Sequence, residues 1–268
     1  MKGLKSKEDI IKHKKAAICK LNALLESFIS SNDDVLLKKT DLLAFWLESY
    51  SRYISFESNF KPAMNIAYKR GDVVKVDFGF NIGSEYGGLH YAVVLDNNNA
   101  HNSPVITVVP LTSVKDDDTT THKHNVYIGD EIYKALKLKH STLSKRIDAE
   151  LTETEKNVNT LKAVINDYSS DSSAPINKNV LNNLKNLLNE SEEKCQTIFD
   201  HQEQLKRISS EIMRMKIGSI AVINQITTVS KMRILDPAKT MDILAGIRCS
   251  KDAMKLINEK VKELYIFS

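Results

Sequence analysis

The side chains best suited to chemistry gather in one stretch of the sequence, residues 70–113. The imidazole of His90 belongs to the side-chain type that titrates near neutral pH, which suits it to moving protons. Thr112 and Ser113 carry hydroxyl groups that can donate hydrogen bonds, and Glu85 brings a carboxylate that can act as a base or anchor its loop. Each also has an ordinary structural explanation, as a half-buried strand residue, two strand-end hydroxyls and a surface carboxylate.

Strand patterns surround these side chains and must position them. Short runs rich in β-branched residues predict strands at 73–76, 91–95 and 105–111, and turn-forming residues at 97–104 separate the last two. The glycine-bearing loop at 79–88 lacks the spacing and the strand–loop–helix context of a nucleotide-binding loop. We therefore interpret this loop as a mobile flap between two strands, over a substrate groove.

Helical patterns flank the β-pattern on both sides. Residues 6–30 and 35–50 carry apolar stripes with helical spacing, and Pro62 marks the break before the first strand. From 143 to 215 the apolar residues follow a heptad rhythm that a Ser/Asp/Pro turn at 169–175 interrupts. This pattern predicts an inserted antiparallel coiled-coil hairpin, which is either a docking arm for a partner or a stabilising arm.

The end of the chain completes the expected fold class, which is α+β. A strand pattern returns at 217–229, and apolar residues between 254 and 266 predict a terminal helix packed on the β-core. The expected domains are an N-terminal helical extension at 1–62, a β-core at 69–135 and 217–268, and an inserted helical hairpin at 143–215.

The composition excludes some classes of protein. A chain of 268 residues with 42% hydrophobic and 27% charged side chains is ordinary for a soluble globular protein. The 38 basic and 34 acidic side chains give a net charge of only +4, so any basic surface for nucleic acid must be local. No run is apolar enough to span a membrane, and the N-terminus lacks the apolar core of a secretory signal.

Metal ligation is not predicted. His122 and His124 lie beside the acidic run at 116–118, but consecutive carboxylates are typical of a solvated loop. The cysteines at 19, 195 and 249 lack metal-ligand spacing and are interpreted as reduced thiols, which indicates a cytoplasmic protein. We expect no cofactor.

A series of short motifs resembles one known family. They are Arg70-Gly71-Asp72-Val73, then the segments 83–88, 92–95, 102–105 and 110–113, and later 218–222 and 224–229. Their order and spacing are similar to those of the MazF/PemK-type toxins of bacterial type II toxin–antitoxin systems. The resemblance covers about 69–130 and 217–265 and leaves out the N-terminal helices and the hairpin.

The resemblance implies a small SH3-like β-barrel, usually dimeric, that cleaves single-stranded RNA without a metal. A base removes the proton of a ribose 2′-hydroxyl, that oxygen attacks the adjacent phosphorus, and an acid protonates the leaving 5′-oxygen. The products are a cyclic phosphate and a 5′-hydroxyl, and cationic or hydrogen-bonding groups stabilise the charge on the phosphorane. The implied partners are single-stranded RNA, a cognate antitoxin protein and a second copy of the chain, without a membrane.

The resemblance also implies site residues. The loop of the family ends in Gly-x-Arg-Pro with a catalytic arginine, whereas Gly88-Leu89-His90-Tyr91 places a histidine there. We therefore predict that His90 is a general acid or base. Thr112 matches the active-site threonine of the family, Ser113 stands next to it, and Glu85 is a further catalytic candidate.

The predicted RNA-binding residues are Arg70, Lys75, Gln225, Thr227 and Arg233. Arg70 and Lys75 supply local positive charge near the expected mouth of the barrel. Gln225 and Arg233 are candidates for base or phosphate contacts, with a structural role as the alternative. Thr227 stands where the family often has an arginine, so a second cation is absent.

Three functions stay open at this point. The first is an endoribonuclease toxin, which His90 and Thr112 favour. The second is a non-catalytic barrel that binds RNA or inhibits a protein such as DNA gyrase, which the missing arginine and Thr227 favour. In the third, the helical additions carry the function and the barrel is a scaffold.

Overall fold

The computed structural model describes residues 6–114, 122–170 and 178–266. The chain divides into two units, one made of Met1–Phe60 with Phe78–Gly88 and one made of Lys61–Asp77 with Leu89–Ser268. Helices and antiparallel strands occur together, so the α+β fold class is confirmed. The division into three domains that we expected from the sequence stays a prediction.

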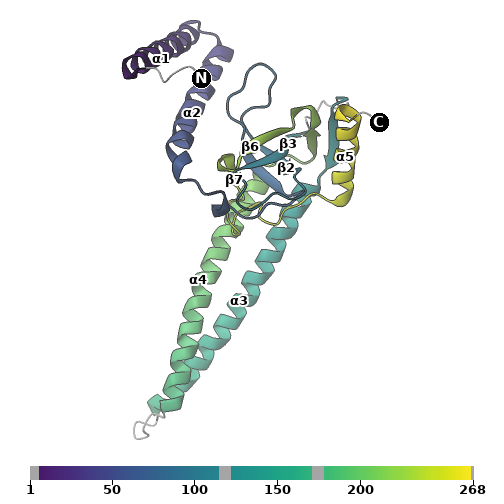
Figure 1. The fold of residues 1–268 in the computed structure, drawn as a ribbon. Helices are drawn as coiled ribbons and strands as arrows, with labels where there is room; N and C mark the ends of the chain where they lie inside the picture. Colours follow the sequence, from purple (N-terminus) through teal and green to yellow (C-terminus); the bar gives the residue numbers. More distant parts are fainter. Residues whose placement is uncertain (1–5, 115–121, 171–177, 267–268) are drawn as a thin grey trace. The chain divides into compact units, whose positions relative to one another are not determined.

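The first unit contains the two predicted N-terminal helices. Helix α1 spans Lys7–Ser30 and α2 spans Asp34–Phe56, followed by the short 3-10 helix η1 at Glu57–Asn59 (Figure 1). The side chains of Ser6 and Asp33 accept hydrogen bonds from backbone N–H groups of the first turns. These two caps explain where the helices begin, because the first N–H groups of a helix have no partner within it.

The loop Phe78–Gly88 belongs to the same unit and contacts α2. Gly79 has φ +77°, and a Cβ there would lie 2.7 Å from the ring of Trp46. Only glycine fits this position, because it combines a left-handed backbone with a close aromatic neighbour. The loop is closed by hydrogen bonds from Gly88 N to Gly79 O (2.7 Å) and from Phe78 N to Gly88 O (2.8 Å).

The second unit is built on an antiparallel seven-stranded sheet with the order β4-β5-β3-β2-β1-β7, and β6 pairs with β3. The strands are β1 (Val73–Asp77), β2 (Leu89–Val94), β3 (Val105–Ser113), β4 (Asn125–Gly129), β5 (Ser219–Val222), β6 (Thr227–Ser230) and β7 (Ile234–Asp236). Within the described residues the two end strands, β4 and β7, do not pair with each other, so the sheet is open and the closed barrel that we expected is not seen.

Strand β3 organises the sheet because it pairs with three others. Its first half pairs with β6, from Val105 opposite Ser230 to Val108 opposite Thr227. Its end pairs with β5, where Ser113 lies opposite Ser219, and its middle pairs with β2. The N-terminal end of β5 is thereby fixed beside Thr112 and Ser113.

The strand pattern predicted at 217–229 corresponds to two short strands in the structure. The 3-10 helix η3 at Ile223–Gln225 separates β5 from β6. Strand β7 was not predicted, because it is only three residues long and its burial comes from pairing with β1. Two further 3-10 helices, η2 (Pro62–Met64) and η4 (Lys231–Arg233), lie in connecting segments.

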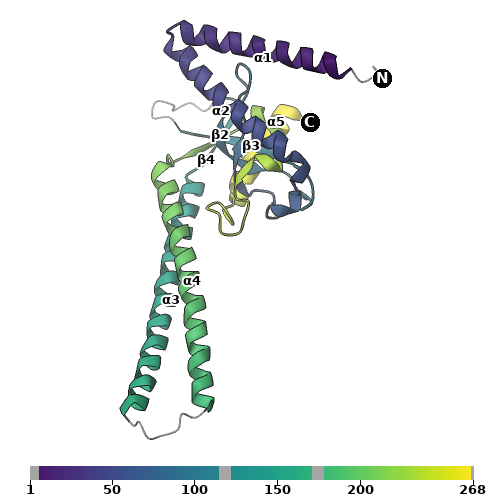
Figure 2. The ribbon, with the colours of Figure 1, turned by 90° about the vertical axis from the view of Figure 1, so that its left-hand side faces the viewer.

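The inserted segment forms two long helices, α3 (Glu131–Ser170) and α4 (Lys178–Arg214), which run antiparallel side by side (Figures 1 and 2). Helix α3 begins earlier than the predicted start at 143. The reason is that Ile132 and Leu136 are buried and extend the apolar stripe of Leu143 and Ile147 towards the sheet. The expected turn at 169–175 lies largely outside the described residues.

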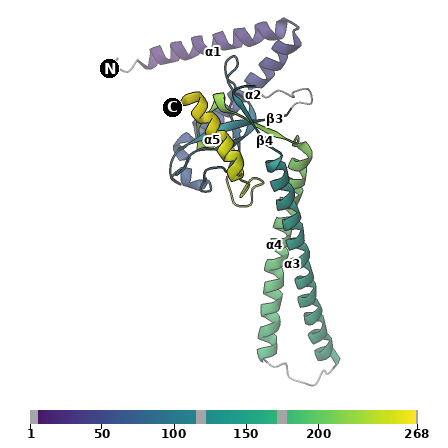
Figure 3. The same ribbon diagram turned by 90° about the vertical axis from the view of Figure 1, so that its right-hand side faces the viewer.

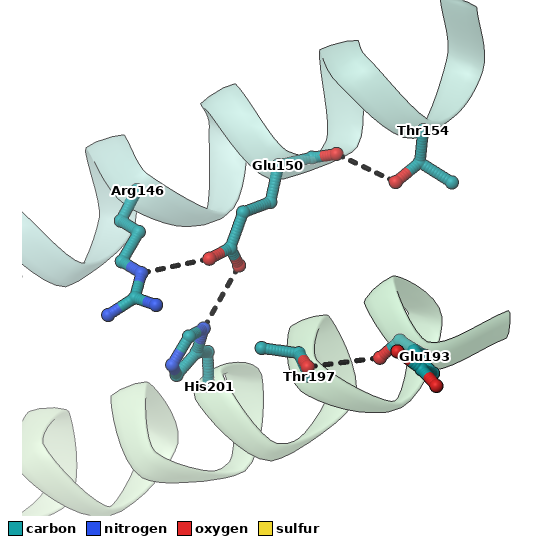
Figure 4. Close-up of polar contacts among 6 residues, drawn as sticks. All are labelled: Arg146, Glu150, Thr154, Glu193, Thr197 and His201. Carbon is teal, nitrogen blue, oxygen red and sulfur yellow. Dashed lines mark hydrogen bonds and ion pairs between the residues drawn. The ribbon is translucent and has the colours of Figure 1, made fainter. Parts of the chain in front are cut away.

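The contact between α3 and α4 is partly polar (Figure 4). Glu150 on α3 accepts a hydrogen bond from Nε of Arg146 (2.8 Å), and its other oxygen lies 3.0 Å from Nδ1 of His201 on α4. His201 and Thr154 are buried in the position that apolar side chains occupy elsewhere, whereas Leu188 of the predicted heptad is half exposed. Burial acts to raise the pKa of Glu150, but the hydrogen bonds and charges of Arg146 and His201 outweigh it and lower that pKa.

Both helices hold the segment after β7 at the base of the hairpin. Lys139 of α3 donates to the carbonyl oxygens of Asp242, Ile243 and Ala245 at 2.8–2.9 Å. Gln204 and Arg207 of α4 donate to the carbonyl oxygen of Met241. The base of the hairpin is therefore attached by five hydrogen bonds to the segment Met241–Ala245 that follows β7.

The predicted terminal helix is confirmed as α5 (Lys251–Tyr265), which contacts β4 (Figure 3). Ala253, Met254 and Ile257 form the buried face of this helix and pack in the hydrophobic core. Ser250 caps this helix and also donates to Glu131 at the start of α3 (2.6 Å). Within the described ranges, no helix combines the length and the hydropathy that a membrane span requires.

Candidate active site

A cavity of about 410 Å³ lies where the sheet meets the end of α4. Strands β1 to β3 and the start of β5 form one side of it, and the last turn of α4 with the residues after it forms the other. The side chains with chemistry that line it are Lys75, His90, Tyr91, Thr112, Ser113, Glu211, Arg214, Lys216 and Ser219. A concave site with a few convergent polar groups is the usual form of a ligand or active site.

Three of the four predicted catalytic residues, His90, Thr112 and Ser113, line this cavity together with the predicted RNA-binding residue Lys75. Strand pairing brings them together. His90 lies opposite Val76 on β1, one position from the pair of Lys75 and Tyr91. Thr112 and Ser113 end β3, which is the next strand in the sheet after β2.

The two sides of the cavity are joined by Glu211 of α4. Its Oε1 lies 2.6 Å from the Lys75 ammonium and also accepts a hydrogen bond from the Tyr91 hydroxyl. The Lys75 ammonium lies 5.4 Å from the centroid of the Tyr91 ring. Each of the three side chains comes from a different element, so the contact fixes α4 against β1 and β2.

This network sets the protonation of two groups. Burial acts to raise the pKa of Glu211, but the hydrogen bonds from Lys75 and Tyr91 and the charges of Lys75 and Arg214 outweigh it and lower that pKa. Burial, followed by the hydrogen bond to Glu211, raises the pKa of Tyr91. At neutral pH Glu211 is therefore a carboxylate and Tyr91 a protonated phenol.

The cavity is electropositive. Its lining contains three basic side chains, Lys75, Arg214 and Lys216, against one carboxylate, that of Glu211. Glu211 balances the charge of Lys75 through their ion pair, whereas Arg214 and Lys216 are solvent-exposed. A concave surface with a net positive charge attracts anions such as phosphate groups.

The other predicted site residues lie elsewhere. Arg70 donates to the carbonyl oxygen of Leu95 and to Asn258, which attaches α5 to the end of β2. Arg233 donates from Nε to the carbonyl oxygen of Asp77 (2.7 Å). The remaining three are Glu85 in the first unit, whose carboxylate accepts from Ile82 N, Gln225 in η3, and Thr227 at the exposed start of β6.

The metal interpretation finds no support among the described residues. No group of three or more His, Cys, Asp or Glu side chains in that part of the chain is arranged to hold a metal ion. The acidic run at 116–118, which the sequence places beside His122, lies outside the described residues.

Sequence reasoning missed Tyr91, Glu211, Arg214 and Lys216. The sequence alone carried no signal for the last two, because the strand pairing that brings them to the cavity joins segments far apart in the chain. Arg214 and Lys216 come directly before β5, and the start of β5 pairs with the end of β3. Basic residues at this point in the chain must therefore lie near Thr112 and Ser113.

Residues 69–164 match the model of a family described as PemK-like, MazF-like toxin of type II toxin-antitoxin system. The matched segment contains β1 to β4 and the first part of α3, and with them Lys75, His90, Thr112 and Ser113. No curated protein matches the chain. Residues 69–164 are therefore similar to MazF/PemK-type toxins, as the sequence motifs in that range predicted, whereas the later motifs at 218–229 and helix α4 lie outside the match.

Proposed function

We propose that this chain is the toxin of a type II toxin–antitoxin system and cleaves single-stranded RNA in the cavity between the sheet and α4. The observation that supports the proposal most is that His90, Thr112 and Ser113 line one electropositive cavity. All three lie inside the segment that matches the toxin family. The reaction is metal-independent transfer of the phosphorus from the 5′-oxygen to the neighbouring 2′-oxygen.

His90 moves a proton in this reaction. The bond from the 2′-oxygen to phosphorus forms as a base takes the 2′-hydroxyl proton, and the bond to the 5′-oxygen breaks as an acid protonates that oxygen. Of the side chains that line the cavity in the described part of the chain, His90 belongs to the type whose ordinary pKa, about 6.5, lies nearest to neutrality. Glu211 and Tyr91 are engaged with each other and with Lys75.

The hydroxyl groups of Thr112 and Ser113 bind the phosphate. They sit at the end of β3 on the same cavity as His90 and are half-buried. A hydroxyl that donates to a non-bridging oxygen stabilises the charge that grows on the phosphorane. The strand fixes their position before the substrate binds, so little reorganisation is needed.

The proposed function includes the fold type, the assembly and the inhibitor that the family resemblance implies. The sheet corresponds to the SH3-like barrel of the family, and α3 and α4 form a coiled coil. The chain acts in the cytoplasm as a homodimer, without a cofactor, and a cognate antitoxin holds it inactive by filling the RNA groove. Glu85 stays a catalytic candidate, and Arg70, Gln225, Thr227 and Arg233 stay candidates for contacts with RNA outside the cavity.

The test is cleavage of a long single-stranded RNA in the presence of EDTA, by purified protein freed of any co-purified inhibitor. Wild type should give discrete cuts that end in a cyclic phosphate and a 5′-hydroxyl, and His90→Ala should abolish them. His122→Ala is the matched control, because His122 is exposed and does not line the cavity. Cuts that persist in His90→Ala would support the nuclease function but contradict the assignment of His90 as its general acid or base.

A non-catalytic role in RNA binding is the second candidate, which the absence of the family's arginine at position 90 favours. It predicts that folded wild-type protein binds RNA and leaves it intact. Binding without any cut in the same experiment would contradict the nuclease and support this alternative.

A further inference from the structure

The end of α4 brings a pair of basic side chains to the cavity from outside the family match. Arg214 is the last residue of α4, and Lys216 follows it before β5. Both line the cavity that contains His90, Thr112 and Ser113. The hairpin is therefore part of the cavity wall as well as an attached arm.

We propose that Arg214 contacts the scissile phosphate and stabilises its transition state, so that the inserted hairpin completes the active site. This inference rests on the proposed function. Phosphoryl transfer needs a cation where negative charge grows on the phosphorane oxygens. Lys75 is poorly suited to that task, because its ammonium already forms an ion pair with Glu211 at 2.6 Å.

Arginine at position 214 is chemically suited to the phosphate. Its planar guanidinium presents parallel N–H donors that match two oxygens of one phosphate group. Arg214 is exposed in this structure, so a substrate can reach it. Lys216, a point charge on a flexible stem, suits a neighbouring phosphate of the RNA chain.

Glu211 positions Arg214. The two residues are three apart on α4, so their side chains leave the same face of the helix. Glu211 is held by Lys75 of β1 and Tyr91 of β2, which turns this face towards the sheet. Arg214 is thereby directed to the same cavity as His90.

The turn from α4 into β5 is fixed as well. Gly218 has φ +89°, and a Cβ there would lie 2.9 Å from Cγ2 of Val114. Its carbonyl oxygen accepts a hydrogen bond from Val114 N (3.3 Å), directly after Ser113. A left-handed glycine packed this closely holds the end of the hairpin next to the end of β3.

The test compares Arg214→Ala and Arg214→Lys with wild type in single-turnover cleavage of RNA. Arg214→Ala should slow cleavage by about 100-fold or more, since one transition-state donor is removed. Arg214→Lys should retain more activity than Arg214→Ala, because lysine keeps the positive charge although it lacks the parallel N–H donors of the guanidinium. Lys206→Ala is the matched control: it removes a positive charge from the same helix at an exposed pair with Glu203, outside the cavity.

A second readout separates phosphate contact from a purely structural role. Binding of a 2′-O-methyl RNA, which lacks the attacking hydroxyl, is measured at several salt concentrations. Loss of one phosphate contact should reduce the slope of log affinity against log salt by about 0.7, whereas Lys206→Ala should leave it unchanged. A loosened fold with no lost phosphate contact would lower the melting temperature and keep the slope.

The outcomes distinguish this inference from the proposed function. Wild-type rate and slope in Arg214→Ala, with His90→Ala inactive, would overturn the role of Arg214 and leave the nuclease in place. No cleavage by wild type would overturn the proposed function and this inference together. Slow cleavage with a reduced slope in Arg214→Ala, at an unchanged melting temperature, is the result we expect.

Discussion

Lys75 on β1 and Glu211 on α4 are 136 residues apart in the sequence, and their side chains form an ion pair with 2.6 Å between Nζ and Oε1. Both side chains are largely shielded from solvent, with 27% and 10% of their surfaces exposed. The pair joins the strand core to the inserted hairpin at the wall of the candidate active site.

Removing Glu211 should destabilise the protein. Glu211→Ala leaves the Lys75 ammonium and the Tyr91 hydroxyl without their shared acceptor, which should cost about 1–3 kcal/mol of unfolding free energy. Urea unfolding of wild type and Glu211→Ala measures this loss of free energy. Glu203→Ala is the control, because its pair with Lys206 is solvent-exposed and surface pairs contribute little. Equal losses in the two variants would contradict a structural role for the Lys75–Glu211 pair.

Stability should fall in acid, and Glu211 should account for part of the loss. Its pKa is lower in the folded protein than its ordinary value of 4.5, so its contribution is present above that value and is lost as the pH falls through the folded pKa. Glu150, whose pKa is also lowered, acts in the same direction. Urea midpoints at pH 7 and in acid should converge between wild type and Glu211→Gln, whereas a constant difference would contradict this linkage.

The Thr112 hydroxyl should matter for cleavage and little for folding. Thr112→Val keeps the shape of the side chain and removes the donor, which should slow cleavage by about 10- to 100-fold. Thr107→Val is the control on the same strand, where the hydroxyl lies 3.2 Å from that of Thr228 and away from the cavity. Single-turnover cleavage rates of Thr112→Val and Thr107→Val are compared, and equal rates would exclude a phosphate contact at Thr112.

Gly79 should be essential for the contact between its loop and α2. Gly79→Ala adds a methyl group against the ring of Trp46 at a left-handed position, which should destabilise this unit by about 1–3 kcal/mol. Trp46 is the single tryptophan of the chain, so its fluorescence reports on that contact directly. Gly83→Ala is the control, because its backbone is also left-handed but nothing lies within 4 Å. The same emission shift in both variants would show that backbone strain, rather than the ring contact, is responsible.

The strands and helices could be predicted largely from the sequence, because alternation and helical spacing report burial directly. The positions of β1, β2, β3 and both N-terminal helices follow these patterns. Strand β7 and the start of α3 could not be placed, since their burial depends on partners far away in the chain. The polar contact of Glu150 with His201 was equally invisible, because it replaces an apolar pair in the hairpin.

The candidate site could be predicted only in part. His90, Thr112 and Ser113 belong to neighbouring strands, and a family resemblance was enough to bring them together. Glu211 and Arg214 were missed because heptad spacing describes how α3 meets α4 and says nothing about how the helix end meets the sheet. Arg70 was predicted from its charge alone, and its contacts with Leu95 and Asn258 now define its surroundings.

The most direct test of a shared active site is the single-turnover rate on a short RNA that spans one mapped cut. Wild type is compared with His90→Ala, Arg214→Ala and His122→Ala, after each variant has been shown to have the melting temperature of wild type. We expect a loss of about 100-fold or more for the His90 and Arg214 variants, from opposite sides of the cavity, and an unchanged rate for His122→Ala. Equal rates in all four proteins would contradict the account and place the chemistry outside this cavity.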